Sequence, residues 1–214
     1  MAPTLSPELV LEGALTLADE IGIEAFTIRK LAATIDAKPM SIYHHLPSKE
    51  AIIDGMVDLV FAEIELPPDD TDWKTAMGVR ARSARAILAR HQWAAPLMES
   101  RTNPGPATLG HHDAVLGCLR RGGLSVEMTA HAYAVIDAFI YGFALQEASL
   151  PATSGDEMAE LVDTVAAGAP MENYPHMMEL VAQHVMKPGY DFGKEFDFGL
   201  DLILNGLEAA ALDR

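Results

Sequence analysis

The sequence predicts an all-α protein in which a small N-terminal head of three helices is joined to a larger helical body. Three observations lead to this fold class. Apolar residues recur at helical spacing along nearly the whole chain of 214 residues, and no segment shows the strict alternation that marks a β-strand. An acidic, proline-containing segment, LPPDD at residues 66–70, interrupts the pattern. We therefore expect the head at residues 1–47, a connecting helix at 48–66 and the body at 67–214.

Each helix of the head, and the connecting helix after it, begins at a residue that suits a helix start. Ser and Thr side chains accept hydrogen bonds from the free amides of a first turn, and proline fits the first helical position because its missing N–H would be unpaired there. Such residues occur at Ser6, Pro7, Thr27, Pro39 and Ser48. They predict four helices, over residues 7–21, 27–35, 39–46 and 48–65.

The body continues the helical pattern to the end of the chain. Its breaks are rich in residues that favour turns over helix interiors, and they read NPGP, RRGG, LPATSGD, GAPMEN and KPGYDFGK. The segments between them predict helices near residues 73–91, 94–100, 106–121, 125–148, 157–168, 174–187 and 195–212. Half of all residues are apolar, so a chain of this length can bury a substantial core.

The composition argues against several classes of protein. A single cysteine, Cys118, rules out a disulfide framework within the chain. The N-terminus lacks the basic and apolar regions of a signal peptide, and no uninterrupted apolar segment approaches the ~20 residues of a membrane span. We expect a cytoplasmic protein without a membrane partner.

The charge is distributed unevenly. A net charge of −16 argues at first against nucleic acid, because phosphate binding relies on Lys and Arg. Residues 25–49, however, contain four basic residues and one acid, a local charge of +3 that leaves −19 for the remainder. This basic island coincides with the two short helices of the head.

Two short helices joined by a tight turn and braced by a longer one form a helix-turn-helix, whose second helix enters the major groove of DNA. Ile42 and Leu46, four residues apart, are expected to anchor the second short helix to the core. Its remaining residues then point outward, and the aromatic ring and hydroxyl of Tyr43 suit a phosphate or a thymine methyl. Lys49 and the free amides of the next helix suit a neighbouring phosphate. Spacing alone leaves the alternative open that these helices are a small bundle with Tyr and His at its rim.

Three parts of the sequence resemble one known family. The run FTIRKLAATIDAKPMSIYHHLPSKEAIIDGMVD at residues 26–58 is similar to the DNA-binding head of the TetR family of transcriptional repressors. The stretches HQWAAPLMESR, GGLSVEMTAHAYAVIDAFIYGFALQE and FDFGLDLILNGLEA resemble the C-terminal domain of its tetracycline-repressor-like subgroup. The resemblance implies a repressor that binds a pseudo-palindromic double-stranded DNA operator as a homodimer and is released by a small-molecule effector.

The resemblance also implies roles for single residues of the head. Arg29 is expected to read a base, with guanine suiting its bidentate guanidinium. Thr27, Ser41, Tyr43 and Lys49 would contact the sugar-phosphate backbone. The full set expected at DNA is Thr27, Arg29, Lys38, Pro39, Met40, Ser41, Tyr43, His44 and Lys49, of which Pro39 and Met40 would make apolar contact with bases.

The last helix carries a regular apolar seam. Phe196, Leu200, Ile203 and Leu207 alternate at spacings of four and three, which is typical of helices packed lengthwise. This seam could pack within one subunit or between two. The resemblance favours a homodimer in which this helix and the one at 125–148 form a four-helix bundle with their symmetry mates. The expected interface comprises Phe196, Gly199, Leu200, Ile203, Gly206 and Leu207.

The helix at 125–148 contains an unusual acid. Asp137 is the only charged residue between Ala132 and Leu145, and it shares a face with Tyr133 and Tyr141. Such a carboxylate needs a partner, which the preceding arginines Arg80, Arg82 and Arg85 could supply in a structural ion pair. Alternatively, this face lines an effector cavity, whose expected residues are Trp93, Met98, His112, Tyr133, Asp137, Phe139 and Tyr141.

We expect no metal, no cofactor and no enzymatic activity. His111, His112 and Asp113 are consecutive, so a helix would spread them over different faces. The resemblance places Leu97 and Gln146 where tetracycline repressors hold a magnesium complex with a histidine and a carboxylate. No nucleophile motif or phosphate loop is present. The alternative to a DNA-binding regulator is a small-molecule-binding helical protein without DNA recognition.

Overall fold

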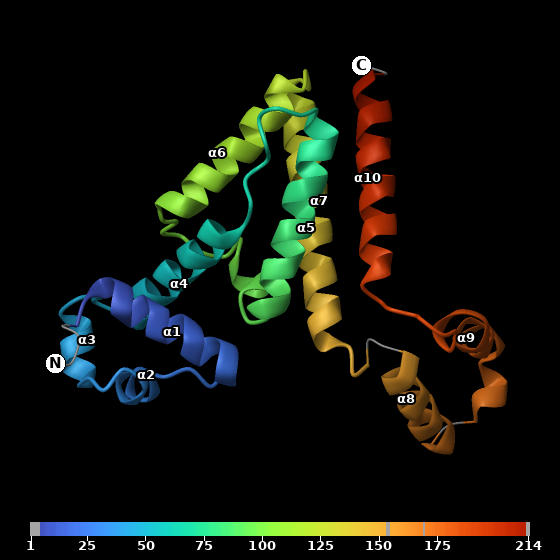
Figure 1. Ribbon diagram of the computed structural model, residues 1–214, viewed down its shortest axis with the longest axis horizontal. Helices are drawn as coiled ribbons and strands as arrows, with labels where there is room; N and C mark the ends of the chain where they lie inside the picture. The colour runs from blue at the N-terminus through green and yellow to red at the C-terminus, as the bar shows by residue number, and fades with distance from the viewer. Residues whose placement is uncertain (1–4, 153–154, 169, 213–214) are drawn as a thin grey trace.

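The computed structural model describes residues 5–152, 155–168 and 170–212, and this part of the chain is helical without any strand. The head consists of α1 (Pro7–Ile21), α2 (Ile28–Thr34) and α3 (Pro39–Tyr43), and α4 (Lys49–Glu63) leads into the body (Figure 1). The body contains α5 (Trp73–Arg90), α6 (Pro106–Arg121), α7 (Val126–Ser149), α8 (Gly155–Gly168), α9 (Pro175–Leu180) and α10 (Lys194–Leu212). This arrangement confirms the expected all-α fold with a three-helix head.

The helix starts of the head follow the predicted capping. The side chain of Ser6 accepts from the amide of Leu9 at 3.3 Å, and Thr27 accepts from the amide of Lys30 at 3.3 Å. Ser48 accepts from the amide of Ala51 at 3.0 Å. These contacts satisfy amides that would otherwise lack a partner in the first turn.

Three elements differ from the prediction. The helix expected at 94–100 shrinks to a 3₁₀ turn, Ala95–Leu97, in which the amide of Leu97 donates to the carbonyl of Ala94 at 2.7 Å. The helix expected at 174–187 ends at Leu180 and continues as a π-helical turn, Val181–Val185. α3 ends at Tyr43, although the amide of Leu46 still donates to the carbonyl of Ile42 at 3.0 Å.

The core extends from the head into the body along α4. Ile52, Met56 and Val60 of α4 are fully buried, and this helix packs on α1 on one side and on α6 on the other. Figure 1 shows α5, α7 and α10 lying alongside one another, with α8 and α9 beyond the lower end of α7. α4 is therefore the element through which the head and the body share a core.

Helix α7 is the one described helix that is long and apolar enough to cross a membrane, with a mean hydropathy of 1.3 over its most apolar window. Half of that window is buried inside the protein. The helix also holds Asp137, which pairs with Arg80 of α5. These features are typical of the central helix of a globular core.

Candidate nucleic-acid interface and core polar site

The outer surface of the head is formed by α2 and α3. Ile42 is fully buried and fixes α3 to the core, while Met40 is 69% exposed and Tyr43 is 38% exposed. The other residues expected at DNA follow the same pattern: Thr27, Arg29, Lys38, Pro39 and His44 are exposed, and Ser41 is half-buried. The short helix thus presents apolar, hydroxyl and cationic side chains to the exterior, next to the exposed Arg29.

Lys49 is engaged within the head. Its Nζ donates to the carbonyl of Phe26 at 3.0 Å and lies 5.6 Å from the centre of the Phe26 ring. The ammonium group has three donors, so one bond to Phe26 leaves others for a phosphate. Thr27 is similarly occupied, since its hydroxyl caps α2. Both residues therefore have a structural task in addition to the expected contact with the backbone of DNA.

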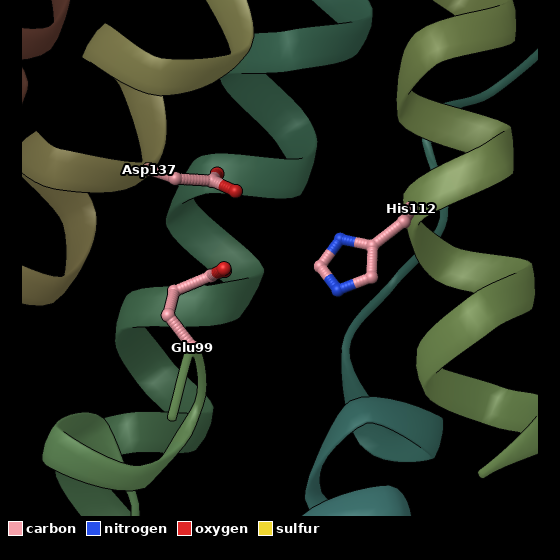
Figure 2. Close-up of side chains that lie close together, drawn as sticks. All are labelled: Glu99, His112 and Asp137. Carbon is pink, nitrogen blue, oxygen red and sulfur yellow. The ribbon is translucent and has the colours of Figure 1, made fainter. Parts of the chain in front are cut away.

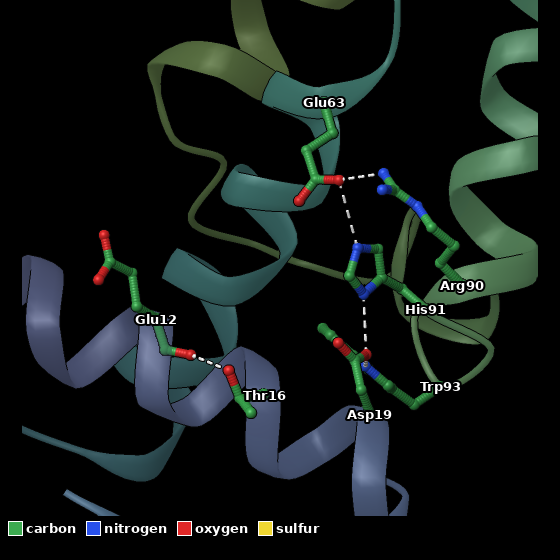
Figure 3. Close-up of polar contacts among 7 residues, drawn as sticks. All are labelled: Glu12, Thr16, Asp19, Glu63, Arg90, His91 and Trp93. Carbon is green, nitrogen blue, oxygen red and sulfur yellow. Dashed lines mark hydrogen bonds and ion pairs between the residues drawn. The ribbon is translucent and has the colours of Figure 1, made fainter.

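The head meets the body at a polar joint formed by α1, α4 and the end of α5 (Figure 3). Asp19 of α1 accepts from the indole Nε1 of Trp93 at 2.7 Å and lies 2.8 Å from Nδ1 of His91. The other imidazole nitrogen of His91 lies 3.4 Å from Glu63 of α4, which also pairs with Arg90. Trp93, expected in the effector cavity, thus belongs to the joint.

A second polar link connects α4 to α6. The carboxylate of Asp58 accepts from the amide of Thr108 at 2.7 Å and from its hydroxyl at 2.8 Å. Gly105, at the start of α6, has no side chain of its own to cap the helix. A Cβ added at Gly105 would lie 2.3 Å from the carboxylate of Asp58. The glycine therefore lets a residue of α4 act as the cap of α6.

The core polar site lies where α5, α6 and α7 pack together. Arg80 and Asp137, both buried, form an ion pair, which confirms the expected partner of the unusual acid. Arg80 Nε also donates to Nε2 of His111 at 3.0 Å. Burial, and secondarily the charge of Arg80, lowers the pKa of His111 to about 3. His111 is therefore neutral, and because Nε2 accepts from Arg80, its proton resides on Nδ1.

Several polar atoms of this site are buried without a partner in the part of the chain that the structure describes: Arg80 Nη2, His111 Nδ1, Thr129 Oγ1, Asp137 Oδ2 and the hydroxyl of Tyr141. Burial, and secondarily the charge of Asp137, raises the pKa of Tyr141, so its hydroxyl keeps its proton. An unpaired buried polar atom costs about 1–3 kcal/mol. The site thus offers donors and acceptors that a polar guest or water would satisfy.

A cavity of about 120 Å³ borders this site, with Met98, Glu99, Thr108 and His112 among its lining residues. The hydroxyl of Tyr133 lies 2.6 Å from Nδ1 of His112. Glu99, His112 and Asp137 bring their ligand atoms within 4.8 Å of one another (Figure 2). Glu99 was not singled out in the sequence, because it lies in an irregular segment with no motif around it.

Five of the seven residues expected at the effector cavity gather in this region: Met98, His112, Tyr133, Asp137 and Tyr141. The other two lie elsewhere. Trp93 occupies the joint to the head, and Phe139 stacks on Phe196 of α10 at 5.2 Å between ring centres. Phe139 therefore packs on α10 in this structure, and its expected role at an effector stays a prediction.

The α10 residues expected at a dimer interface differ in their exposure within the protomer. Phe196 and Leu200 are fully buried inside the protomer, and Leu207 is 9% exposed. Gly199 permits close approach within the same chain, since a Cβ there would lie 2.7 Å from the ring of Phe139. Ile203 is half-buried and Gly206 is exposed. The large apolar side chains that α10 leaves exposed are Phe198, Leu202 and, in its last turn, Leu212.

A helix-turn-helix with an exposed basic recognition surface, joined by polar contacts to a helical body that contains a small cavity, defines the class of a ligand-responsive DNA-binding regulator. Comparison with known proteins gives the family. Residues 10–56 match the family described as bacterial regulatory proteins, tetR family, and residues 66–211 match the tetracyclin repressor-like C-terminal domain. The chain belongs to the TetR family of transcriptional regulators.

Individual relatives agree with this assignment. The chain is 31% identical over 224 residues to the HTH-type transcriptional repressor DrrR1 of Streptomyces coeruleorubidus, covering 99% of this chain and 80% of the relative. It is 27% identical to the tetracycline repressor protein class C of Escherichia coli, and the match covers 97% of this chain and 93% of that protein. The crystal structure of apo ActR from Streptomyces coelicolor matches with a TM-score of 0.78 at 25% identity. The match covers 100% of this chain and 99% of the ActR chain.

Proposed function

We propose that the protein is a cytoplasmic homodimeric repressor that binds a pseudo-palindromic DNA operator and is released by a small-molecule effector bound in its body. One observation carries this proposal: the helix α3, anchored by a buried Ile42, exposes Met40 and Tyr43 within the basic island of the head. These side chains suit the base edges and phosphates of a major groove. The relative DrrR1 is itself a transcriptional repressor.

An exposed apolar face supports the homodimer. Phe198 and Leu202 of α10 are 66% and 59% exposed, and Val135 and Leu145 of α7 are 45% and 41% exposed. α7 and α10 pack against each other, so these residues belong to neighbouring helices. A second copy that covers them would form a four-helix bundle and would place two heads about a two-fold axis.

The mechanism of release follows from the size and position of the cavity. Its volume of about 120 Å³ is smaller than the ~300–1,000 Å³ of typical ligand sites, so a larger effector has to displace the segment around Met98 or α6. Because Asp58 of α4 holds the first turn of α6, a shift of α6 pulls on α4 and thereby on the head. The effector and the operator then favour different arrangements of the two heads.

The same site argues for binding and against catalysis as its role. Its buried groups form a fixed ion pair, a neutral imidazole and protonated phenols. The ActR relative has been solved in complex with actinorhodin, which shows a small molecule bound by a protein of this family. We propose an equivalent role for the present cavity, with an effector of its own.

Selection of random duplex DNA by the full-length protein tests the proposal. Wild type, Arg29→Ala and the matched control Arg82→Ala each enter the selection; Arg82 is an exposed arginine of α5, paired with Asp197, and its loss removes the same charge outside the head. A two-fold-symmetric consensus that survives Arg82→Ala and is relaxed by Arg29→Ala is expected. Failure of wild type to enrich any sequence at low salt would favour a ligand-binding protein without DNA recognition.

A further inference from the structure

The geometry points to a divalent transition-metal site, of the Zn²⁺ class, formed by Glu99, His112 and Asp137. These residues come from three elements: the segment after the 3₁₀ turn, α6 and α7. Their ligand atoms lie within 4.8 Å of one another (Figure 2). A cation at the centre of such a triangle lies at most about 2.8 Å from each atom, and shifts of roughly 0.7 Å would bring it to the ~2.1 Å typical of Zn²⁺.

Asp137 has a carboxylate oxygen that could coordinate a metal ion. Asp137 is 4% exposed, and while Oδ1 pairs with Arg80, its buried Oδ2 has no hydrogen-bond partner among residues 5–152, 155–168 and 170–212. Arg80 neutralises only one of the two carboxylates, so the cluster keeps a net negative charge when His112 is neutral. A cation at Oδ2 would remove the cost of that unpaired atom.

Tyr133 sets the tautomer that this site requires. A metal-binding imidazole needs one nitrogen without a proton, and the proton on the other nitrogen is normally held by a hydrogen bond. The hydroxyl of Tyr133 lies 2.6 Å from Nδ1 of His112, so it can accept Nδ1–H and leave Nε2 free for the metal. Tyr133 is therefore a positioning residue for the metal site.

The donor set selects the class of metal and leaves room for more ligands. One imidazole nitrogen and two carboxylates favour Zn²⁺, Mn²⁺ or Fe²⁺ over Ca²⁺ and Mg²⁺, which prefer oxygen alone. Three protein ligands leave at least one coordination position open. Glu99 and His112 both line the 120 Å³ cavity, so that position faces the cavity.

Calorimetric titration of the tag-free, chelator-treated full chain with Zn²⁺ tests the proposal, and no DNA is needed, so the outcome is independent of the proposed regulation. We expect one Zn²⁺ per chain, with an affinity lowered at least about tenfold in Glu99→Gln and in His112→Gln. The control His131→Gln, which removes an exposed histidine of α7, should bind as wild type does. Absence of stoichiometric uptake, or equal affinity in wild type and Glu99→Gln, overturns the site.

A variant of Tyr133 tests whether its hydroxyl positions the imidazole of His112, apart from any effect on folding. Tyr133→Phe keeps the ring and removes the hydroxyl, and the loss of such an outer partner typically lowers metal affinity by about 10- to 100-fold. Nitrogen-detected NMR of the imidazole should show the Nδ1-protonated form of His112 in metal-bound wild type. An unchanged affinity in a folded Tyr133→Phe protein would contradict the positioning role, and metal bound through Nδ1 would contradict the assigned tautomer.

Discussion

In the head, hydrogen bonds within the protein already hold two of the residues expected at DNA. Lys49 and Thr27 are tied into the head by hydrogen bonds to Phe26 and Lys30. Arg29 is exposed on α2, next to the recognition helix. Among these three side chains, Arg29 is therefore the one best placed to report on base recognition without disturbing the fold.

Substitution of Arg29 by alanine is expected to cost about 1–3 kcal/mol of operator binding and to relax selectivity at one base pair in each half-site, because a bidentate contact to a base is lost. Fluorescence anisotropy with singly substituted duplexes measures both effects. Lys30→Ala is the matched control, since Lys30 Nζ bonds to the carbonyl of Ala25. Equal weakening on every duplex would show that Arg29 contacts phosphate and no base.

His111 makes the stability of the body depend on pH. Its pKa falls from the usual 6.5 to about 3 on folding, so between these values the unfolded chain binds a proton that the folded chain excludes. The contribution is fully present above pH 6.5 and is lost as the pH falls towards 3. Between pH 7.5 and 5.5 this amounts to about 1.4 kcal/mol.

Urea unfolding of wild type and His111→Gln at pH 7.5 and pH 5.5 measures this contribution. Wild type should lose about 1.4 kcal/mol more than the variant over this interval. His131→Gln serves as the control, because its exposed side chain should leave the difference unchanged. A variant with the same pH dependence as wild type would place the titrating group elsewhere.

At the scale of the element, α4 joins the two parts of the molecule through polar contacts made along its length and at its C-terminal end. Glu63 faces His91 and Arg90, Asp54 accepts from Arg101 at 2.5 Å, and Asp58 caps α6. The sequence predicted the helix and its N-cap at Ser48, because capping depends on residues a few positions apart. It could not predict the contact between Asp58 and Thr108, which depends on the packing of two helices 50 residues apart.

Removal of the Asp58 carboxylate should uncouple the body from the head. Asp58→Ala is expected to lower the free energy of unfolding by about 1–2 kcal/mol, as for the loss of a helix cap. It should also reduce the change in operator affinity that the effector causes. Asp58→Asn retains an oxygen acceptor, so its free energy of unfolding and its effector response should lie between those of wild type and Asp58→Ala. A full effector response in a folded Asp58→Ala protein would show that α6 and α4 communicate by another route.

At the scale of the whole molecule, sequence periodicity predicted the helices, but it did not show which apolar residues of α10 pack within the chain. Phe196 and Leu200 form a regular seam, yet they pack on α5 and α7 of the same chain. A helix with apolar residues on both sides does not reveal which side meets its own core. Likewise, the cluster of Glu99, His112 and Asp137 unites three distant segments, and no spacing within the sequence could predict it.

The exposed face leads to a prediction about assembly. Phe198→Glu places a charge at the centre of the proposed interface, where Phe198 is 66% exposed in the protomer, and should shift the protein from dimer to monomer without unfolding it. Sedimentation equilibrium measures the shift. The control Leu212→Glu changes an exposed residue at the last turn of α10. A Phe198→Glu protein that remains fully dimeric would exclude this face as the interface.

The most direct test of the account compares wild-type binding to a duplex with two symmetric half-sites and to a duplex of equal length with one. We expect two chains per two-site duplex and far tighter binding than to the single half-site, because a dimer engages both recognition helices at once. Equal affinity for the two duplexes, with one chain bound to each half-site independently, would contradict the proposal of a homodimeric operator-binding regulator.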